Sequence, residues 1–259
     1  MKYDTVKDKF AKLIEIIPFF RKLFYLLLDM LLLRQWYVKR EIKKYFPESK
    51  SVKYHDAGAG FCQYSYFVLK NWKKSQVHTS DIKTDYINSF EYYAKTVGMQ
   101  NVSCAQGDLT NYIPKDKFDL ITAIDIMEHI EDDVQVLKNF SSSLQKGGKL
   151  IISSPSNFDE SAAFTEEHVR PGYSKEDIIS KLESTGFSIV SFEYTYGTFG
   201  KIYWNLALKI PLSLIEKSKI FLFILPLYYL IFYPLSFVFM MLDLKVKNNI
   251  GTGILVVAE

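Results

Sequence analysis

The chain has 259 residues, is 48% hydrophobic and 24% charged, and carries a formal net charge of +3. This length suits one large domain with additions, or a domain with a small appendage. The two cysteines, Cys62 and Cys104, are too few for a disulfide framework and lack the spacing of a zinc site, so we expect a reduced, cytoplasmic compartment. The first twelve residues are rich in charge, which is not the pattern of a secretory signal.

Charge is distributed unevenly along the chain. Residues 1–50 carry a net charge of +6 and residues 199–259 a net charge of +3, whereas residues 51–198 carry −6. The two basic segments are also the most apolar ones. This combination indicates contact with an anionic membrane surface. We do not expect a nucleic-acid partner, because the middle segment has no basic stripe with interleaved aromatic residues.

Residues 1–50 are predicted to be helical. Apolar residues recur there at spacings of three and four, at Val6, Phe10, Leu13, Ile14 and Ile17. Pro18 interrupts this pattern, and the apolar run Leu23–Leu33 that follows is too short to span a bilayer and contains Asp29. We expect a buried or interfacial helix, which is followed by a basic cluster at Arg34, Lys39, Arg40, Lys43 and Lys44.

Residues 51–198 alternate strand-like and helix-like segments, as in a parallel α/β sheet. The strands are predicted at 51–56, 76–81, 101–106, 118–124, 148–153 and 187–195. The helices are predicted at 62–72, 83–97, 131–145 and 174–185. Gly147-Gly148 and Gly186 are interpreted as stops after two of these helices.

The C-terminal part contains Ile220–Leu242, a run of 23 residues without a charged side chain that is interrupted by Pro226 and Pro234. Its length suits a transmembrane helix, but residues 250–259 look like a strand that returns to the same sheet. A single crossing would leave that strand on the far side of the membrane. The prolines favour two short helices with a bend. For residues 199–249 we therefore expect monotopic insertion into one leaflet first, a hydrophobic cap over a lipid-sized pocket second, and a true span last.

A glycine-containing turn, Asp56-Ala57-Gly58-Ala59-Gly60, follows the first predicted strand and precedes a helix. Glycines there permit unusual backbone angles and let a ligand approach the main chain. The dinucleotide fingerprint needs a third glycine where Gln63 stands, which disfavours a nicotinamide cofactor. An acidic residue before the first glycine fits a cofactor with an amino-acid end. Taken alone, the turn could also be a plain strand–helix connection.

Acidic residues follow the next predicted strands in order. Asp81 stands where a carboxylate can accept both hydroxyls of a ribose, Asp108 could accept from an adenine amine, and Asp125 and Glu128 follow the fourth strand. Any one of them could be a helix cap. Their shared position at the carboxyl edge of an α/β sheet nevertheless indicates a ligand site.

With these motifs the chain resembles the class I S-adenosylmethionine-dependent methyltransferases, and within them the branch that contains the ubiquinone-biosynthesis methyltransferases. The resemblance rests on five motifs in chain order: Asp56-Ala57-Gly58-Ala59-Gly60, Ser80-Asp81, Gly107-Asp108-Leu109, Phe118-Asp119-Leu120 and Met127-Glu128-His129-Ile130. It covers residues 51–195, with Gly251–Glu259 as the last, antiparallel strand. It implies an α/β, Rossmann-like sheet of seven strands, here with helical, apolar additions at both ends.

The resemblance implies S-adenosylmethionine as the cofactor. The methionine end would lie at the glycine turn, the ribose at Asp81 and the adenine at Asp108. The full set of predicted cofactor-binding residues is Asp56, Ala57, Gly58, Gly60, Tyr64, Asp81, Ile82, Asp108, Leu109 and Asp125. Cys62 departs from the family, in which many members have another glycine at that position.

Methyl transfer from a sulfonium is an in-line displacement in which alignment supplies much of the acceleration. A phenol, alcohol or acidic carbon also needs a base. The candidates are His129, and then His168 and Tyr173 in a loop after the fifth strand, with a structural role as the alternative for each. Asp125, Glu128 and His129 are similar to the E-x-x-E-H pattern of ubiquinone O-methyltransferases, which is associated with a divalent metal. These three are candidate ligands, but we do not expect a metal.

The sequence thus predicts an enzyme that is peripheral or monotopic on the inner face of the cell membrane and that methylates a lipophilic small molecule. The acceptor is expected to be a quinone or phenol with a long tail, a polyene or an acyl species, with O-methylation preferred over C- or N-methylation. The alternative is a membrane-bound cofactor-binding protein without catalysis.

Overall fold

The computed structural model describes residues 18–47, 50–158 and 168–259. Seven strands form one sheet in the order β3-β2-β1-β4-β5-β7-β6. They are β1 (Lys53–Ala57), β2 (Gln76–Asp81), β3 (Val102–Gln106), β4 (Phe118–Ile124), β5 (Leu144–Pro155), β6 (Ile189–Thr195) and β7 (Gly253–Ala258). Strands β1 to β5 are parallel, and β7 is antiparallel to β5 and β6. The predicted α/β sheet of seven strands with an antiparallel last strand is confirmed.

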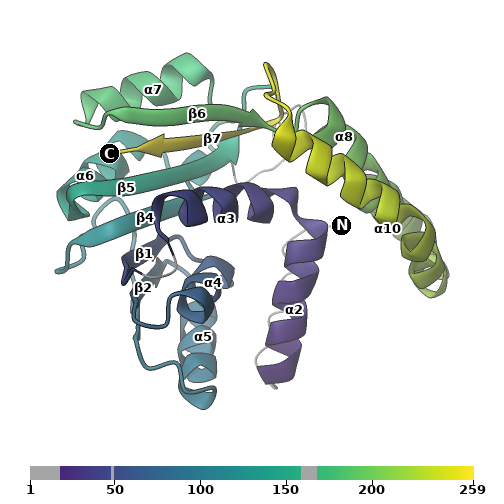
Figure 1. The fold of residues 1–259 in the computed structure, drawn as a ribbon, viewed down its shortest axis with the longest axis horizontal. Helices are drawn as coiled ribbons and strands as arrows, with labels where there is room; N and C mark the ends of the chain where they lie inside the picture. Colours follow the sequence, from purple (N-terminus) through teal and green to yellow (C-terminus); the bar gives the residue numbers. More distant parts are fainter. Residues whose placement is uncertain (1–17, 48–49, 159–167) are drawn as a thin grey trace.

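Helices cover both faces of this sheet (Figure 1). One apolar core lies under α3 (Leu33–Tyr45), α4 (Gln63–Asn71) and α5 (Thr84–Thr96), and the other under α6 (Asp133–Ser143) and α7 (Lys175–Ser184). Neighbouring residues of one strand supply both cores, because successive side chains point to opposite faces. Leu120 belongs to the first core and Ile121 to the second, and both are fully buried. This two-sided burial suits the apolar sequences of β4 and β7 in the middle of the sheet.

The helices of the core begin and end within two residues of their predicted bounds, but the start of β5 differs. β5 begins at Leu144, which pairs with Phe118, and the β4–β5 ladder then shifts register and absorbs the extra residues. Gly147-Gly148 therefore lies inside an irregular strand, and its interpretation as a helix stop is wrong. Gly186 does follow α7, with the left-handed φ of 90° that such a position favours.

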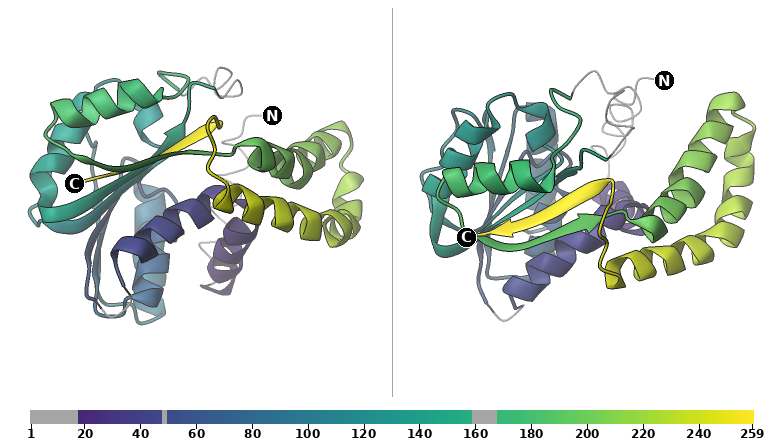
Figure 2. Two further views of the ribbon diagram at one scale, coloured as in Figure 1. Left: turned by 45° about the horizontal axis from the view of Figure 1, so that its top comes forward. Right: turned by 90° about the horizontal axis from the view of Figure 1, so that it is seen from above.

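The apolar run near the C-terminus forms one continuous helix. α10 extends from Phe221 to Lys245 and contains both Pro226 and Pro234, so the expectation of two short helices is wrong. Each proline removes one helical hydrogen bond, but α10 packs along the preceding helical segment. That segment consists of α8 (Thr198–Trp204), the π-helical η3 (Asn205–Lys209) and α9 (Ile210–Lys217). We call residues 198–245 the hairpin; it projects away from the sheet (Figure 2).

Polar contacts hold the two arms of the hairpin together. The π-helical segment disturbs the regular pattern of backbone hydrogen bonds. Two tyrosines of α10 donate to carbonyl oxygens there: Tyr228 Oη to Leu206 O at 2.7 Å and Tyr229 Oη to Ala207 O at 2.9 Å. The hairpin is therefore a defined structural unit and not an irregular apolar loop.

A buried aspartate fixes the base of the hairpin to the domain. The carboxylate of Asp243 accepts from Tyr37 Oη at 2.8 Å, from Gly200 N at 2.9 Å and from Tyr196 N at 3.1 Å. These partners come from α3, from α8 and from the residue after β6, so one side chain joins three segments. The hairpin begins after β6 and ends before β7, and these two strands are neighbours in the sheet. Both ends of the hairpin are therefore attached to the same edge region of the domain.

The N-terminal helix α2 (Pro18–Leu31) lies beside the carboxyl ends of the strands (Figure 1). Buried Arg21 holds it in place by donating to Ser89 on α5 and to Tyr25 Oη, and Tyr25 Oη donates to Phe61 O at 2.7 Å. The predicted apolar stripe from Val6 to Ile17 lies outside the described residues.

Candidate active site

A cavity of about 370 Å³ opens at the carboxyl end of the sheet, where the glycine turn, β4 and the N-terminal helices meet. Its size lies in the range of small-molecule sites, roughly 300–1,000 Å³. The wall residues come from four places in the chain: Phe24, Leu28 and Arg34; Gly58, Gly60 and Tyr64; Lys83 and Tyr86; Ile124 and Asp125. The predicted edge of the sheet is therefore hollowed.

The glycine turn adopts the left-handed backbone that only glycine takes easily. Gly58 has a φ of 67° and Gly60 a φ of 49°. Gly58 N donates to Ser80 O at 2.8 Å, and Gly60 N donates to Asp81 Oδ2 at 2.8 Å. Cys62 also has a left-handed φ, 58°, a conformation that favours glycine. The turn is thus tied directly to the carboxyl end of β2.

Asp56 lies beneath the turn and does not line the cavity. Its buried carboxylate accepts from Ser65 N at 3.0 Å, from Ser65 Oγ at 2.7 Å and from Thr122 Oγ1 at 3.2 Å. Burial raises the pKa of this carboxyl to about 6, while the hydrogen bonds act in the opposite direction. In this geometry Asp56 joins β1, α4 and β4 under the turn and does not itself face a ligand.

Four other predicted cofactor residues lie at or just after the carboxyl ends of β2 and β3 and do not line the cavity: Asp81, Ile82, Asp108 and Leu109. Asp81 is nearly buried, and its second oxygen accepts from Lys83 N at 2.8 Å, while Ile82 beside it is exposed. Asp108 is exposed and accepts from Thr110 N at 2.9 Å. Three of the predicted residues are buried in the core or wall: Ala57, Tyr64 and Leu109.

Arg34 is a site residue that no sequence motif marks. It forms an ion pair with Asp125 in the wall of the cavity, and its backbone N–H donates to Tyr196 Oη at 3.0 Å. Asp125 has a left-handed φ of 52°, which is uncommon for a residue other than glycine. The sequence places Arg34 only in a basic cluster, whereas the structure places it in the cavity wall.

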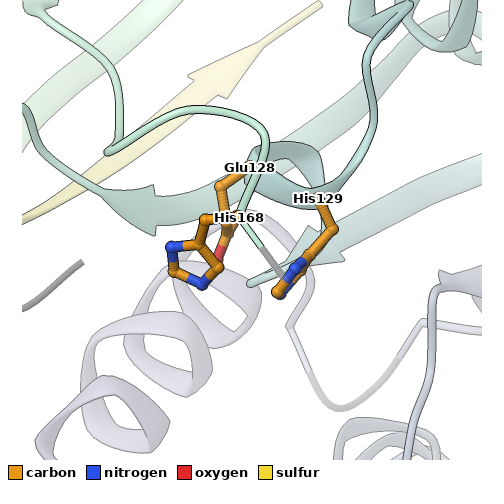
Figure 3. Close-up of side chains that lie close together, drawn as sticks. All are labelled: Glu128, His129 and His168. Atoms are coloured by element: carbon orange, nitrogen blue, oxygen red, sulfur yellow. The ribbon is translucent and has the colours of Figure 1, made fainter. Parts of the chain in front are cut away.

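Two histidines and a carboxylate converge beside this ion pair (Figure 3). Candidate ligand atoms of Glu128, His129 and His168 lie within 4.8 Å of one another, and the two imidazole rings meet edge to face at 4.6 Å. Buried Glu128 accepts from Ser154 Oγ at 3.0 Å, and burial raises the pKa of its carboxyl. These groups could act as acid and base, or could hold a divalent cation with the two-histidine, one-carboxylate donor set.

This set differs from the ligands predicted from the sequence. Asp125 is turned toward Arg34, and His168 takes the third place beside Glu128 and His129. The ion pair explains the difference, because it engages the carboxylate that the motif would have directed to a metal.

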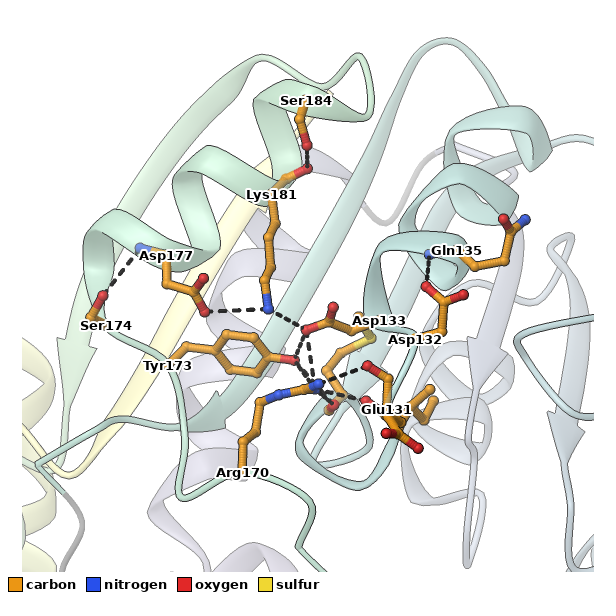
Figure 4. Close-up of polar contacts among 12 residues, drawn as sticks. Glu131, Asp132, Asp133, Gln135, Arg170, Tyr173, Ser174, Asp177, Lys181 and Ser184 are labelled. Atoms are coloured by element: carbon orange, nitrogen blue, oxygen red, sulfur yellow. Dashed lines mark hydrogen bonds and ion pairs between the residues drawn. The ribbon is translucent and has the colours of Figure 1, made fainter.

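A polar cluster clamps the loop of His168 onto the loop of His129 (Figure 4). Arg170 donates to Met127 O at 2.8 Å and to Ile130 O at 2.7 Å, and it pairs with Asp133 at 3.0 Å. Tyr173 Oη donates to the same carboxylate at 2.7 Å and is fully buried, which raises the pKa of the phenol. Tyr173 thus belongs to the clamp, where its buried hydroxyl is engaged by Asp133 and Arg170, so its placement does not support a catalytic role.

Comparison with known proteins identifies the fold family. A family model described as a methyltransferase domain matches residues 48–192, which is more than half of the chain. The chain belongs to this methyltransferase family. Matching solved structures include a putative sarcosine dimethylglycine methyltransferase from Galdieria sulphuraria (TM-score 0.60, 16% identity, covering 86% of this chain and 82% of that one). Another is a coclaurine N-methyltransferase bound to N-methylheliamine and SAH (TM-score 0.59, 15% identity, covering 85% and 70%).

Two curated relatives match parts of this methyltransferase. An uncharacterised protein of Methanocaldococcus jannaschii is 28% identical over 171 residues, which are 61% of this chain and 47% of that protein. The (S)-coclaurine N-methyltransferase of Papaver somniferum is 30% identical over 100 residues, which are 38% and 28%. The matched segments thus span less than half of either relative. The chain thus carries a methyltransferase domain; S-adenosylmethionine as its cofactor and membership of the ubiquinone-biosynthesis branch stay predictions.

Proposed function

We propose that this methyltransferase transfers a methyl group to a lipophilic acceptor while bound to the cytoplasmic face of a membrane. The observation that carries the proposal is the exposed apolar surface of α10. Among the described residues, α10 is the one helix long and apolar enough to cross a membrane, with a mean hydropathy of 2.0, yet only 6% of its apolar window is buried. A core helix of that composition would be buried, whereas exposed apolar patches of this kind mark contact surfaces.

The cavity fits the cofactor of the family. Arg34 and Asp125 offer opposite charges to the carboxylate and ammonium of its zwitterionic amino-acid end. No heavy atom lies within 4 Å of a Cβ built on Gly60, so the turn leaves room for close approach. Asp81, at the end of β2, would accept from the ribose hydroxyls once Gly60 N or Lys83 N exchanges partner.

A cluster of two histidines and a glutamate could remove a proton from the acceptor. Glu128, His129 and His168 do not line the cavity itself. Glu128 and His129 follow the wall residue Asp125 closely in the chain, and the charge of Arg34 acts on Glu128 by lowering the pKa that burial raises. Proton removal suits a phenol or alcohol, so O-methylation is preferred. N-methylation is the second candidate, because both named coclaurine methyltransferases act on nitrogen by their names.

The function can be tested with methyl-labelled S-adenosylmethionine and a lipid extract of bacterial membranes. We expect label in the organic phase, on a product that gains one methyl group, and fragmentation by mass spectrometry distinguishes O-, N- and C-methylation. Asp81→Ala is expected to lose both cofactor binding and labelling. Label found only in water-soluble products would overturn the lipophilic acceptor. Cofactor binding without any turnover would favour a non-catalytic protein.

Arg34→Gln is expected to weaken S-adenosylmethionine binding by about tenfold to a hundredfold, because it removes a charge-assisted contact worth ~1.5–3 kcal/mol. The matched control is Arg40→Gln on the same helix, whose ion pair with Glu193 lies outside the cavity. Isothermal titration of both variants measures the difference. If both variants bind S-adenosylmethionine with equal affinity, Arg34 does not contact the cofactor.

His129→Gln is expected to lower kcat by roughly a hundredfold or more, the usual contribution of general acid–base catalysis, with cofactor affinity unchanged. His78→Gln is the matched control, because that imidazole contacts Ser103 and Tyr112 away from the cavity. Steady-state kinetics on the methylated lipid provides the measurement. A variant with unchanged kcat would assign His129 a structural role.

A further inference from the structure

The most exposed apolar side chains of α10 share one face. Phe223, Leu227 and Leu230 follow at i, i+4 and i+7, and Phe223 and Leu230 are 86% and 73% exposed. The other arm adds Trp204 and Leu212 to the exposed apolar surface of the hairpin. No described segment of the chain covers this face, so a partner that is itself apolar is required in the folded protein.

The charges of the hairpin disfavour an orientation across a bilayer. The first arm, residues 198–217, is about 30 Å long, close to the thickness of the hydrocarbon core. Lys209 is exposed near the middle of this arm, about 12 Å along the axis from Lys217 at its end. A transverse hairpin would place the Lys209 ammonium near the bilayer centre, which costs ~2.5–3.5 kcal/mol on insertion scales.

The tip disfavours a second orientation, in which the hairpin enters one leaflet tip first. Glu216, Lys217 and Lys219 lie within four residues at the tip, and all three are exposed. The opposite end of α10 is also basic, at Lys245 and Lys247. Lysines at both ends of an apolar helix match the anionic headgroups of a bilayer when the helix lies along its surface, because long lysine side chains reach the headgroup layer while the apolar face enters the acyl region.

The N-terminal helix α2 extends this surface toward the cavity. Its exposed apolar side chains Phe19, Leu23 and Leu26 also follow at i, i+4 and i+7. The opposite side of α2 supplies Phe24 and Leu28 to the wall of the cavity. The hairpin contacts α2 directly, since Tyr233 Oη of α10 donates to Met30 O at 3.1 Å near the C-terminal end of α2.

We propose that the hairpin lies along the interface of an anionic phospholipid bilayer, with Phe223, Leu227 and Leu230 in the acyl region and its charged tip at the headgroups. An acceptor dissolved in the bilayer then reaches the cavity past α2 and does not cross water. This inference rests on the proposed function and adds the orientation of the enzyme on its membrane.

The test uses the full chain with Cys104→Ser, because the remaining Cys62 is buried. Single cysteines are introduced as Leu230→Cys on the apolar face, Lys219→Cys at the tip and Tyr92→Cys on α5, a control that is 65% exposed. Each variant is treated with a membrane-impermeant maleimide, with and without vesicles of phosphatidylcholine and phosphatidylglycerol. Vesicles are expected to slow labelling at Leu230→Cys by about tenfold or more through burial in the acyl region, and to leave Lys219→Cys and Tyr92→Cys unchanged.

Other labelling patterns would overturn the proposed orientation. If vesicles protect Lys219→Cys and detergent permeabilisation restores its labelling, the hairpin crosses the bilayer. If a fluorophore attached at Lys219→Cys is quenched by a quencher placed deep in the acyl chains, the hairpin inserts tip first. No protection at Leu230→Cys would show that lipid does not cover the face. Labelling is measured without cofactor or acceptor, so the orientation can fail while lipid methylation stands. The labelling pattern can likewise hold in a protein that lacks turnover.

Discussion

Gly58→Ala is expected to abolish detectable S-adenosylmethionine binding, whereas Gly98→Ala is expected to leave binding intact. Both glycines have a left-handed φ, 67° and 76°, so both substitutions carry a backbone cost of ~1–2 kcal/mol. The difference lies in the space around the new Cβ. At Gly58 it would lie 2.6 Å from Ile126 Cγ1, whereas at Gly98 no heavy atom lies within 4 Å.

The displacement of Ile126 is what gives this variant its large effect. Ile126 stands between Asp125, in the cavity wall, and the short helix η1 (Met127–His129) that carries Glu128 and His129. Pushing it outward would disturb both the cofactor side and the acceptor side. Isothermal titration and thermal unfolding of the two variants separate the effects: both should lose stability through the left-handed φ, Gly58→Ala more because of the clash with Ile126, and only Gly58→Ala should lose the ligand. Wild-type affinity in Gly58→Ala would contradict the assigned cofactor turn.

Backbone strain at other residues concentrates around the same cavity. Three described residues other than glycine have a left-handed φ: Cys62, Asp125 and Tyr196. Cys62 follows the glycine turn, Asp125 lines the cavity, and Tyr196 Oη accepts the backbone N–H of Arg34. Such conformations cost ~1–3 kcal/mol each and persist where the surrounding structure enforces them. Their clustering is consistent with a site built for ligand geometry at some expense of stability.

The core of the fold was predictable from sequence because its signals are local. Alternating strand-like and helix-like segments specify a parallel α/β sheet. A local cap marks the start of α7, where Ser174 accepts from Asp177 N. Local rules failed where tertiary contacts dominate. Pro226 and Pro234 indicated a break in α10, but the structure has one unbroken helix. It packs against the other arm of the hairpin and is held there by the hydrogen bonds of Tyr228 and Tyr229.

The site was predictable where strand order places residues at one edge, as for Asp81 and Gly58. It was not predictable where side chains from distant segments meet. Arg34 comes from a helix that lies outside the matched family region, and its pairing with Asp125 depends on how α3 packs on the sheet. Arg170 acts through carbonyl oxygens, which leave no pattern in the sequence.

The double variant Phe223→Glu with Leu230→Glu is expected to reduce partitioning onto anionic vesicles by about a hundredfold. Each large apolar side chain contributes ~1.5–3 kcal/mol when it leaves water, and each glutamate adds repulsion from the anionic surface. Both positions are highly exposed, so the substitutions leave the packed side of α10 and the contacts of Asp243 in place. Cosedimentation with phosphatidylglycerol vesicles measures the change.

A matched substitution on the far side of the domain separates insertion from charge. Tyr92→Glu with Lys95→Glu on α5 changes net charge by more than the hairpin variant does but leaves its apolar face intact. If apolar insertion dominates, the α5 variant should partition almost as the wild type does, and raised salt should weaken its binding only moderately, since screening acts on the lysines and not on buried apolar surface. Equal losses in the two variants would instead make attraction between charges the main source of membrane binding. Unchanged partitioning of the hairpin variant would show that α10 does not enter the bilayer and would leave its exposed face to a protein partner.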